Sequence, residues 1–372
     1  RKIYLMKISI LLPYKENFSP NYAGAVSLFV NDITNESIFK KTTFIYGSTL
    51  SDKRLSKNYI NLDLKKKIFS STSKQYVKTF LNIEKKVHSD LIEVHNRPNY
   101  IKLLKKEYRN RITLFFHNDP LTMNGSRSIE ERLYLLNNID KIIFNSNWSK
   151  NRFFLDIPNK ILLSQKTSVC YQSASRANID FEKKQKIISF VGKLNTAKGF
   201  DLFGTAIIKV LNKHKNWKAV IIGDEPREKL SYKHKNLKIL GFRTNTFILN
   251  KLEKVSISVV CSRWNEPFGR TSLEAASRGS AVIISNRGGL PETAVDAIIL
   301  KSLTAEELYS SIDKLIIDKK RLNNLQRKNY KNFTLTHKYV ASIIDKIRKQ
   351  FSKNFYVNSF NIKKNITLKI LH

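Results

Sequence analysis

The stretch Cys261–Glu292, CSRWNEPFGRTSLEAASRGSAVIISNRGGLPE, carries the most informative pattern in this chain of 372 residues. Two carboxylates, Glu266 and Glu274, stand eight positions apart, separated by a Pro-Phe-Gly turn and the expected start of a helix. A second turn, GGLPE, closes the stretch. Carboxylates accept hydrogen bonds from hydroxyl groups, and backbone N–H groups at a helix N-terminus bind phosphates with help from the helix dipole. The pattern therefore predicts a site for a ligand that carries both hydroxyls and phosphates.

Short apolar runs alternate with helical patterns on both sides of a polar, poorly periodic segment. We expect strands at 8–12, 43–47, 91–95, 112–117 and 141–145, and again at 187–192, 219–223, 237–240, 257–260 and 281–285. Helices are expected to begin near residues 23, 71, 98, 128 and 148, and near 198, 245, 271 and 305. Such alternation indicates βαβ units with parallel sheets. The expected domains are residues 1–163 and 187–334, joined by a linker over 164–186, and an amphipathic helix is expected from about 338 to 351.

A second motif, FVGKLNTAKGF at residues 190–200, ends an apolar strand in Gly192 and places Lys193 and Lys198 around a loop that opens a helix. Together with E-x7-E and GGLPE, this motif resembles the retaining glycosyltransferases of family 4, also called glycosyltransferases group 1. The resemblance covers most of the chain and is strongest from 190 to 292. It implies an α/β GT-B fold, in which two facing Rossmann-like doubly wound domains enclose an interdomain cleft. It also implies that a C-terminal helix, about 335–372, completes the N-terminal, acceptor-side domain.

The resemblance implies transfer of a sugar from a nucleoside diphosphate sugar with retention at the anomeric carbon, without a metal or other cofactor. Role by role, it implies catalytic residues at His117 and Glu266, and donor-sugar contacts from Glu266, Phe268 and Gly269. Contacts to the donor diphosphate are implied for Gly24, Lys193, Lys198, Gly269, Arg270, Thr271 and Ser272. Ribose and nucleobase contacts are implied for Glu274, Phe242 and Arg243, and an acceptor side at His95 and Arg97. One departure is the Ala-Gly-Ala at 23–25, where many relatives have two adjacent glycines.

The formal net charge of +37 is compatible with nucleic acid, an anionic membrane surface or an acidic substrate. Basic residues are densest at 53–67, KRLSKNYINLDLKKK, although lysine is spread along the whole chain. A nucleic-acid-binding protein is disfavoured, because no reading motif is recognisable and aromatic residues do not interleave with this cluster. Two cysteines are too few for a disulfide framework or a Cys-based zinc site and fit a reducing cytosol. No apolar run reaches the 18 residues of a spanning helix.

Three functions stay open at this point. The leading one is a hexosyltransferase-type enzyme (EC 2.4) that acts on a cell-surface glycan or its lipid-linked precursor, as in polysaccharide or lipopolysaccharide biosynthesis. That enzyme is expected in the cytoplasm, with the cluster at 53–67 binding peripherally to the inner face of the cytoplasmic membrane. The second is a glycosyltransferase with a small soluble acceptor. The third is a basic nucleic-acid-binding protein without enzymatic activity.

Overall fold

A computed structural model describes residues 6–64, 71–158, 165–294 and 296–351. The described residues fall into two compact units. Unit 1 takes residues from Arg1–Phe144, Phe153–Cys170 and His337–His372, and unit 2 takes residues from Asn145–Arg152 and Tyr171–Thr336. The segment 145–152 therefore lies with unit 2, although it directly follows a strand of unit 1.

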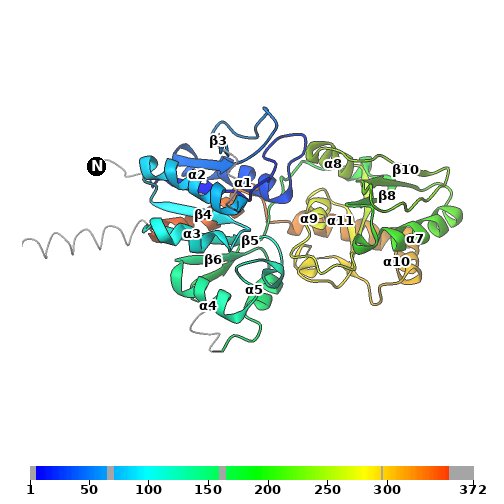
Figure 1. Ribbon diagram of the computed structural model, residues 1–372. Coiled ribbons are helices and arrows are strands. Elements are labelled where there is room, and N and C mark those ends of the chain that lie inside the picture. Colours follow the sequence, from blue (N-terminus) through cyan, green and yellow to red (C-terminus); the bar gives the residue numbers. More distant parts are fainter. Residues whose placement is uncertain (1–5, 65–70, 159–164, 295, 352–372) are drawn as a thin grey trace, which may run out of the picture. The chain divides into compact units, whose positions relative to one another are not determined.

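Unit 1 is built on a seven-stranded parallel sheet with the order β3-β2-β1-β4-β5-β6-β7 (Figure 1). Its strands are β1 (Ile8–Leu11), β2 (Thr43–Gly47), β3 (Tyr59–Asn61), β4 (Leu91–His95), β5 (Arg111–Phe116), β6 (Lys141–Phe144) and β7 (Thr167–Val169). Its helices are α1 (Ala25–Glu36), α2 (Thr72–Val87), α3 (Tyr100–Glu107), α4 (Ile129–Asn138) and a helix over 337–351. Short 3-10 turns are η1 (Lys40–Thr42) and η2 (Pro120–Thr122).

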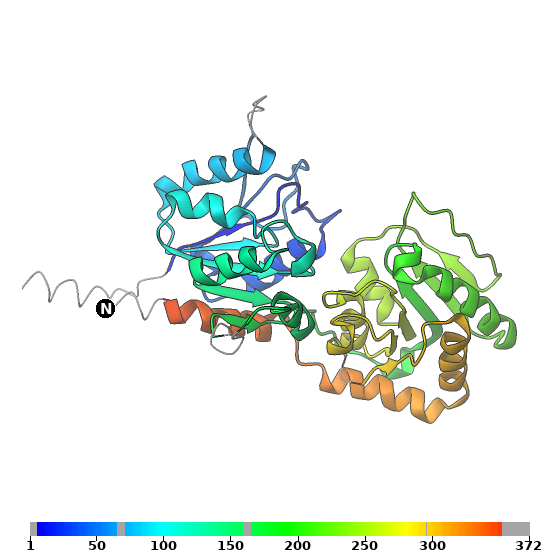
Figure 2. The same cartoon turned by 60° about the horizontal axis from the view of Figure 1, so that its bottom comes forward.

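Helices cover both faces of the unit 1 sheet because side chains alternate along each strand. In β4, Ile92 and Val94 are fully buried in a core shared with apolar residues of α2, α3 and α4. Glu93 and His95, on the opposite face, meet Arg348 of the helix 337–351 and Phe29 of α1. Figure 2 shows the C-terminal helix, in red, alongside this sheet. The strands from the start of the chain and the helix 337–351 from its end thus belong to the same doubly wound α/β unit.

The helix 337–351 is anchored to the unit 1 sheet by a buried ion-pair network. Arg348 donates to both carboxylate oxygens of Glu93 in β4 (2.8 and 2.7 Å), and also to Asp345 (3.1 Å) and Ser37 (3.0 Å). The side chains of Arg348 and Glu93 are each only 2% exposed. Two carboxylates and one hydroxyl accept hydrogen bonds from the buried guanidinium, and the carboxylates balance its positive charge inside unit 1.

Unit 2 is built on a six-stranded parallel sheet with the order β10-β9-β8-β11-β12-β13. Its strands are β8 (Gln185–Val191), β9 (Lys218–Ile222), β10 (Leu237–Ile239), β11 (Val255–Val260), β12 (Ala281–Ile284) and β13 (Ile298–Ile299). Its helices are α5 (Asn147–Phe153, shared with unit 1 at its last residue), α7 (Phe200–Lys213), α8 (Asn245–Leu252), α9 (Arg270–Ser277), α10 (Ala305–Ile317) and α11 (Lys319–Asn332). Its 3-10 turns are η3 (Phe181–Lys183), η4 (Thr196–Lys198) and η5 (Leu290–Glu292).

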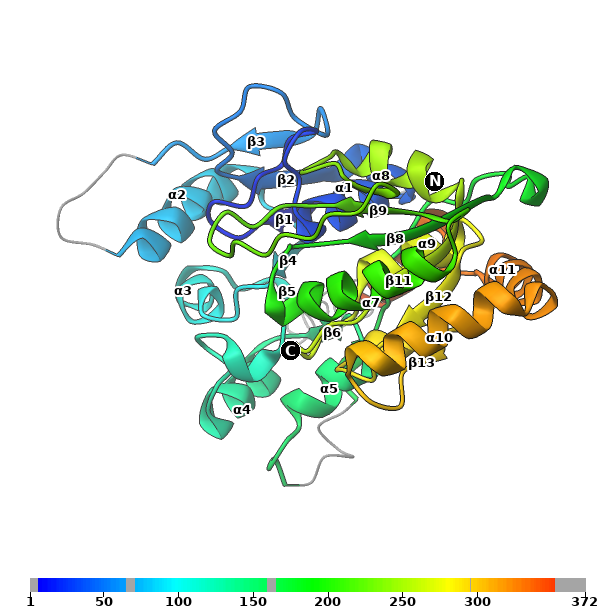
Figure 3. The same cartoon turned by 90° about the vertical axis from the view of Figure 1, so that its right-hand side faces the viewer.

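Two buried apolar clusters cover the two faces of the unit 2 sheet. One joins α7 and α10 to alternate residues of β8, β9, β11 and β12, and Figure 3 shows these two helices next to each other. The other joins α8 and α9 to the remaining positions of the same strands. The α/β GT-B class predicted from the sequence is therefore confirmed: the chain holds two parallel sheets with alternating helices.

Among the residues that the structure describes, three strands and one α-helix were not predicted from the sequence pattern. The strands β3, β7 and β13 are two or three residues long and lie at sheet edges, so they lack a long apolar run. The strand β7 falls inside the segment 164–186 that was interpreted as a linker. The helix α11, KKRLNNLQRKNYKN, is strongly polar, and it buries Gln326 and Asn329 by donating to the backbone oxygens of Ser256 and Ser280.

Candidate active site

The loop after β8 places Lys198 at the carboxyl end of the unit 2 sheet. The side chain of Asn195 accepts a hydrogen bond from the backbone N–H of Lys198 (3.0 Å), which holds the short turn η4. Gly199 follows in the left-handed conformation with φ 73°, and a Cβ atom there would stand 2.0 Å from the backbone oxygen of Cys261. Only glycine fits this close approach. Lys193, in the same loop, is exposed.

Lys198 and Glu266 form an ion pair across this end of the sheet. Nζ of Lys198 lies 2.5 Å from Oε1 of Glu266, and the same oxygen accepts from Oγ of Ser262 at 2.6 Å. The Gly-Gly turn fixes the backbone of Glu266, because Gly289 N–H donates to its carbonyl oxygen (2.7 Å) and Gly288 forms an isolated parallel bridge with it. Two motifs that lie about 70 residues apart in the sequence thus meet through their side chains.

Helix α9 begins at this site and points its N-terminus toward it. Gly269 precedes the helix with φ 116°, and a Cβ atom there would approach Leu290 Cδ1 at 2.4 Å. Backbone N–H groups of the first turn, from Arg270 onward, form no intrahelical bond to a preceding carbonyl and suit an anion. Ser272 lies in that turn, but its hydroxyl is fully buried and donates to the Gly269 carbonyl (2.8 Å). The whole residue is 0% exposed, so in this conformation Ser272 offers neither its side chain nor its backbone N–H to a ligand, unlike Arg270 and Thr271, which are partly exposed.

Glu274 lies one turn deeper and has two partners. Its Oε1 accepts from Nε of Arg270 (2.7 Å) on the same helix and from Nδ2 of Asn245 (2.8 Å) at the start of α8. The residue is buried, 4% exposed. The carboxylate predicted to bind ribose is thus held in place by a cation and an amide, of which Asn245 was not anticipated from the sequence.

The remaining predicted residues of unit 2 differ in how accessible their side chains are. Phe242 and Arg243 follow β10 and are exposed, and the Arg243 guanidinium lies 5.5 Å from the ring centre of Phe247. The ring of Phe268 is 1% exposed and stacks on Tyr171 with centroids 5.5 Å apart. Phe268 is therefore buried as a whole residue in this conformation, whereas Phe242 is exposed.

Glu292, the last residue of the GGLPE turn, serves the structure of unit 2. Its carboxylate accepts from the backbone N–H groups of Asn147 (2.7 Å) and Trp148 (2.9 Å), the first residues of α5. It also accepts from the hydroxyl of Tyr171 (3.0 Å). Burial and the neighbouring carboxylate raise the pKa of Tyr171 to about 12. This carboxylate caps α5 and attaches the segment 145–152 to unit 2.

In unit 1, His117 and His95 contact each other at the carboxyl ends of β5 and β4. Nδ1 of His95 lies 3.0 Å from Nε2 of His117, and both residues are buried. Burial lowers the pKa of His117 to about 3, and burial together with His117 and Arg348 lowers the pKa of His95 well below its usual value. Both rings are therefore neutral at physiological pH. A side chain as buried as His95 has no access to an acceptor in this conformation.

The glycine loop of unit 1 is occupied by a carboxylate. Gly24 precedes α1 with extended backbone, and a Cβ atom there would meet Oε1 of Glu16 at 2.7 Å. The same Glu16 oxygen accepts from the N–H (3.1 Å) and the hydroxyl (3.0 Å) of Ser27. An anion at this helix N-terminus would have to displace Glu16. Arg97, predicted on the acceptor side, donates to the backbone oxygen of Asn96 (2.7 Å).

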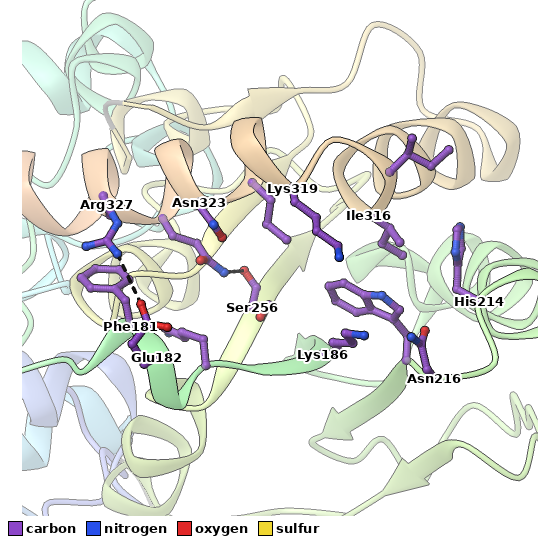
Figure 4. A pocket seen from close by; sticks show the side chains of 15 residues that line it. Phe181, Glu182, Lys186, His214, Asn216, Ser256, Ile316, Lys319, Asn323 and Arg327 are labelled. Atoms are coloured by element: carbon purple, nitrogen blue, oxygen red, sulfur yellow. Dashed lines mark hydrogen bonds and ion pairs between the residues drawn. The ribbon is translucent and has the colours of Figure 1, made fainter.

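Two cavities lie in separate units. In unit 1, an open cavity of about 530 Å³ lies at the carboxyl ends of β1, β2 and β3. It is lined by Tyr14, Lys15, Asn17, Ser48, Thr49, Leu50, Ser51, Asn61, Leu62, Asp63 and Leu64. In unit 2, a cavity of about 460 Å³ lies at the opposite, amino ends of the strands, where Lys186 and Ser256 are the second residues of β8 and β11 (Figure 4). Lys184 of that cavity donates to three backbone oxygens, and burial lowers its pKa to about 7. This second cavity is remote from Lys198 and Glu266 and carries no part of the predicted site.

The described residues offer no other catalytic chemistry of a familiar kind. Burial raises the pKa of the thiols of Cys170 and Cys261 to about 12, so neither is a reactive thiolate. Among these residues no three or more His, Cys, Asp or Glu side chains gather as a metal site would require. The described helices also include none with the length and apolar character needed to cross a membrane. The candidate site is therefore the carboxyl end of the unit 2 sheet, where cationic and carboxylate side chains lie together.

Comparison with known proteins agrees with this geometry. Residues 172–332 match the family described as glycosyl transferases group 1. The chain is 23% identical over 407 aligned positions to the putative glycosyltransferase YtcC of Bacillus subtilis, covering 96% of this chain and 97% of that protein. Its fold resembles sucrose-phosphate synthase from Thermosynechococcus elongatus (TM-score 0.76, 14% identity, 94% and 100% covered). It also resembles WaaG, a glycosyltransferase involved in lipopolysaccharide biosynthesis (TM-score 0.64, 13% identity, 91% and 99% covered).

Proposed function

We propose that this chain, a glycosyltransferase whose residues 172–332 carry the group 1 family match, transfers a sugar with retention from a nucleoside diphosphate sugar to a cell-surface glycan or its lipid-linked precursor. The observation that carries the proposal is the pairing of Lys198 with Glu266 beside the N-terminus of α9. Cations and free backbone N–H groups suit a diphosphate, and carboxylates suit the hydroxyls of a sugar and a ribose. The motif residues thus bring together the cations, N–H groups and carboxylates that can bind a sugar nucleotide.

In this proposal the ion pair between Lys198 and Glu266 opens when the donor binds. The diphosphate replaces Glu266 as the partner of Lys198, and Oε1 of Glu266 then accepts a hydrogen bond from a sugar hydroxyl. Lys193, exposed in the same loop, supplies a second movable cation. Charge that develops on the departing diphosphate is met by these two lysines and by the first turn of α9.

The nucleoside end of the donor is proposed to bind deeper along α9. Glu274, held by Arg270 and Asn245, accepts from the ribose hydroxyls through its second oxygen. Phe242 and Arg243, exposed after β10, offer an aromatic ring and a guanidinium plane on which a nucleobase can stack.

The acceptor is proposed to bind in unit 1, in the cavity at the carboxyl ends of β1–β3. Besides three leucines, its lining includes amides, hydroxyls, one lysine and one carboxylate, which can hydrogen-bond to the hydroxyls of a glycan. The basic segment 53–67 follows one part of this lining, 48–51, and contains another, 61–64, and its last three lysines fall outside the described residues. That placement supports an acceptor presented at an anionic membrane surface. The relationship of the fold to WaaG is consistent with such an acceptor, and that to sucrose-phosphate synthase with a small soluble one.

The first experiment identifies the donor by thermal unfolding with UDP, GDP, ADP and TDP and their sugar derivatives. A ligand at 100 times its Kd stabilises the native state by about 2.7 kcal/mol. We expect one nucleotide family to raise Tm, and the matching sugar nucleotide to support transfer to lipid-linked material extracted from a membrane fraction. Product recovered only in the aqueous phase would favour the soluble acceptor, and stabilisation by none of the nucleotides would contradict the proposal.

A pair of variants then separates the two carboxylates. Glu266→Gln is expected to reduce single-turnover transfer while retaining affinity for the bare nucleoside diphosphate, because it perturbs a contact to the reacting sugar. Glu274→Gln is expected to weaken both the sugar nucleotide and the bare diphosphate, because both contain ribose. Glu306→Gln, in an exposed pair with Lys209, is the matched control. Equal loss of diphosphate affinity in the Glu266 and Glu274 variants would contradict this division of roles.

A further inference from the structure

Two loops of unit 2 are bound to each other beside the candidate ion pair. The first loop, 195–199, follows β8, and the second, 261–266, follows β11. The carbonyl oxygen of Ala197 in the first loop accepts hydrogen bonds from the backbone N–H groups of Arg263 and Trp264 in the second, both at 3.0 Å. These contacts involve no side chain, so the two loops stay attached to each other when a side chain in either of them is replaced.

The side chain of Arg263 adds a second link between the same loops. Its Nη1 donates to the carbonyl oxygen of Thr196 (3.0 Å), two residues before Lys198 in the turn η4. Its Nη1 and Nη2 also donate to the two carboxylate oxygens of Asp201 (2.5 and 2.7 Å) in the first turn of α7. Because Asp201 balances the charge of the guanidinium and engages both terminal nitrogens, Arg263 is poorly suited to bind a diphosphate itself. Its contact with Thr196 instead fixes the turn that carries Lys198.

Ser262, the preceding residue, holds the other member of the ion pair. Its Oγ donates to Oε1 of Glu266 (2.6 Å), and its own carbonyl oxygen accepts from Oγ of Ser285 (2.7 Å), directly after β12. Ser262 is 1% exposed, so this hydrogen bond is shielded from water. Oε1 of Glu266 therefore receives one hydrogen bond from Ser262 and one from Lys198. When Lys198 turns to a diphosphate, one acceptor position on that oxygen becomes vacant and the other stays with Ser262.

We propose that Ser262 and Arg263 are positioning residues for the transfer reaction: Arg263 fixes the turn that carries Lys198, and Ser262 fixes the carboxylate of Glu266. The inference rests on the proposed function for what these two charged groups do to the donor. Two adjacent residues after one strand set the places of both groups before the donor binds, so little reorganisation is needed during the reaction. The position that Lys198 vacates on Oε1 of Glu266 is then the one left for a sugar hydroxyl.

The exposure of the pair between Arg263 and Asp201 separates positioning from a contribution to stability. Their side chains are 39% and 28% exposed, and ion pairs that water reaches contribute little to the free energy of unfolding. Replacing Arg263 by Met, which keeps an unbranched chain without the guanidinium, is therefore expected to leave unit 2 folded. Its effect should appear in the geometry of the turn η4 and hence in the contacts of Lys198.

A double-mutant cycle without ligand tests the positioning by Arg263. Urea unfolding of the unmodified chain, Lys198→Met, Glu266→Gln and the double variant gives the coupling between these two charged groups. We expect Arg263→Met to reduce this coupling by roughly half or more, and Arg327→Met to leave it unchanged. Arg327 is the matched control, because its pair with Glu182 is 60% and 90% exposed and lies in the same unit. An unchanged coupling in the Arg263 variant would overturn its role, whatever the protein is found to catalyse.

Two ligands of different length then separate positioning of Lys198 from a general loss of structure. In Arg263→Met we expect the Kd of the nucleoside diphosphate to rise by roughly 10-fold and that of the bare nucleoside to stay the same, because only the diphosphate reaches Lys198. In the background of Lys198→Ala, the further change Arg263→Met should barely alter the diphosphate Kd. Equal weakening of both ligands, or a full additional loss in the Lys198→Ala background, would refute the positioning of Lys198.

Ser262→Ala tests the positioning of Glu266. We expect single-turnover transfer to fall by roughly 10- to 100-fold while the affinity for the nucleoside diphosphate is retained. In the background of Glu266→Gln the same change should have little effect, and an equal loss in both backgrounds would refute the role of Ser262. Failure of every nucleoside diphosphate to bind the unmodified chain would instead refute the proposed function, while the cycle without ligand still decides whether Arg263 positions Lys198.

Discussion

Replacing Glu274 by Gln is expected to destabilise unit 2 as well as to weaken the binding of the donor. The side chains of Glu274 and Arg270 are 5% and 11% exposed, so their pair lies largely out of water. Removing one charge from a buried pair typically costs about 3–5 kcal/mol, because the other charge stays buried. The Gln carbonyl can still accept one of the two hydrogen bonds that Oε1 receives, which places the expected cost near the lower limit, at about 3 kcal/mol.

Tryptophan fluorescence during urea unfolding is a suitable assay, because all three tryptophans, Trp148, Trp217 and Trp264, belong to unit 2. With a slope of about 2 kcal/mol per M urea, about 3 kcal/mol lowers the midpoint by about 1.5 M. The control Glu306→Gln breaks a pair whose side chains are 46% and 70% exposed, and it should cost less than about 1 kcal/mol. A midpoint shift for Glu274→Gln no larger than that of the control would refute the reasoning.

Four further outcomes are expected. Lys193→Ala and Lys198→Ala should each weaken binding of the bare nucleoside diphosphate by roughly 1–3 kcal/mol in calorimetric titration, and unchanged affinity would remove these lysines from the site. Arg348→Met should destabilise unit 1 by about 3–5 kcal/mol, seen as earlier proteolysis of that unit, because it leaves two carboxylates buried. The pKa of His117 is lowered to about 3 in the folded protein, so the unfolded chain takes up a proton at this residue before the folded chain does. The free energy of unfolding should therefore fall as the pH drops from about 6.5 toward 3, by up to about 1.4 kcal/mol per pH unit. An acid-unfolding curve that is the same in His117→Asn as in the unmodified protein would contradict this. The unmodified chain should float with anionic but not with neutral vesicles, and replacing the basic residues of 53–64 by Gln should weaken that flotation, since each basic residue adds about 1 kcal/mol. Equal recovery of the unmodified chain with both vesicle types would leave these residues as a solvated surface.

Local patterns in the sequence were sufficient for the fold class, and the roles predicted for the motif residues of unit 2 stay predictions. Continuous apolar runs predict buried parallel strands, because a strand covered on both faces needs no polar alternation. That Lys198 and Glu266 lie at the same sheet edge also follows from the sequence, since each lies in the loop that follows such a strand and the carboxyl ends of parallel strands share one edge. Elements without an apolar run were missed: α11 is held partly by side-chain hydrogen bonds of Gln326 and Asn329.

The partners of the motif residues were decided only by the tertiary structure. Asn245 reaches Glu274, and Glu16 reaches the start of α1, from segments whose local sequence contains no signal for these contacts. His95 and His117 are 22 residues apart, and their contact depends on the register of β4 against β5 together with the left-handed turn at Asn96. The sequence alone determined which functional groups are available and which segments form strands and helices, because residue type and local periodicity are properties of the chain itself. Strand register and helix packing decided which groups meet, because they bring together residues that are distant along the chain.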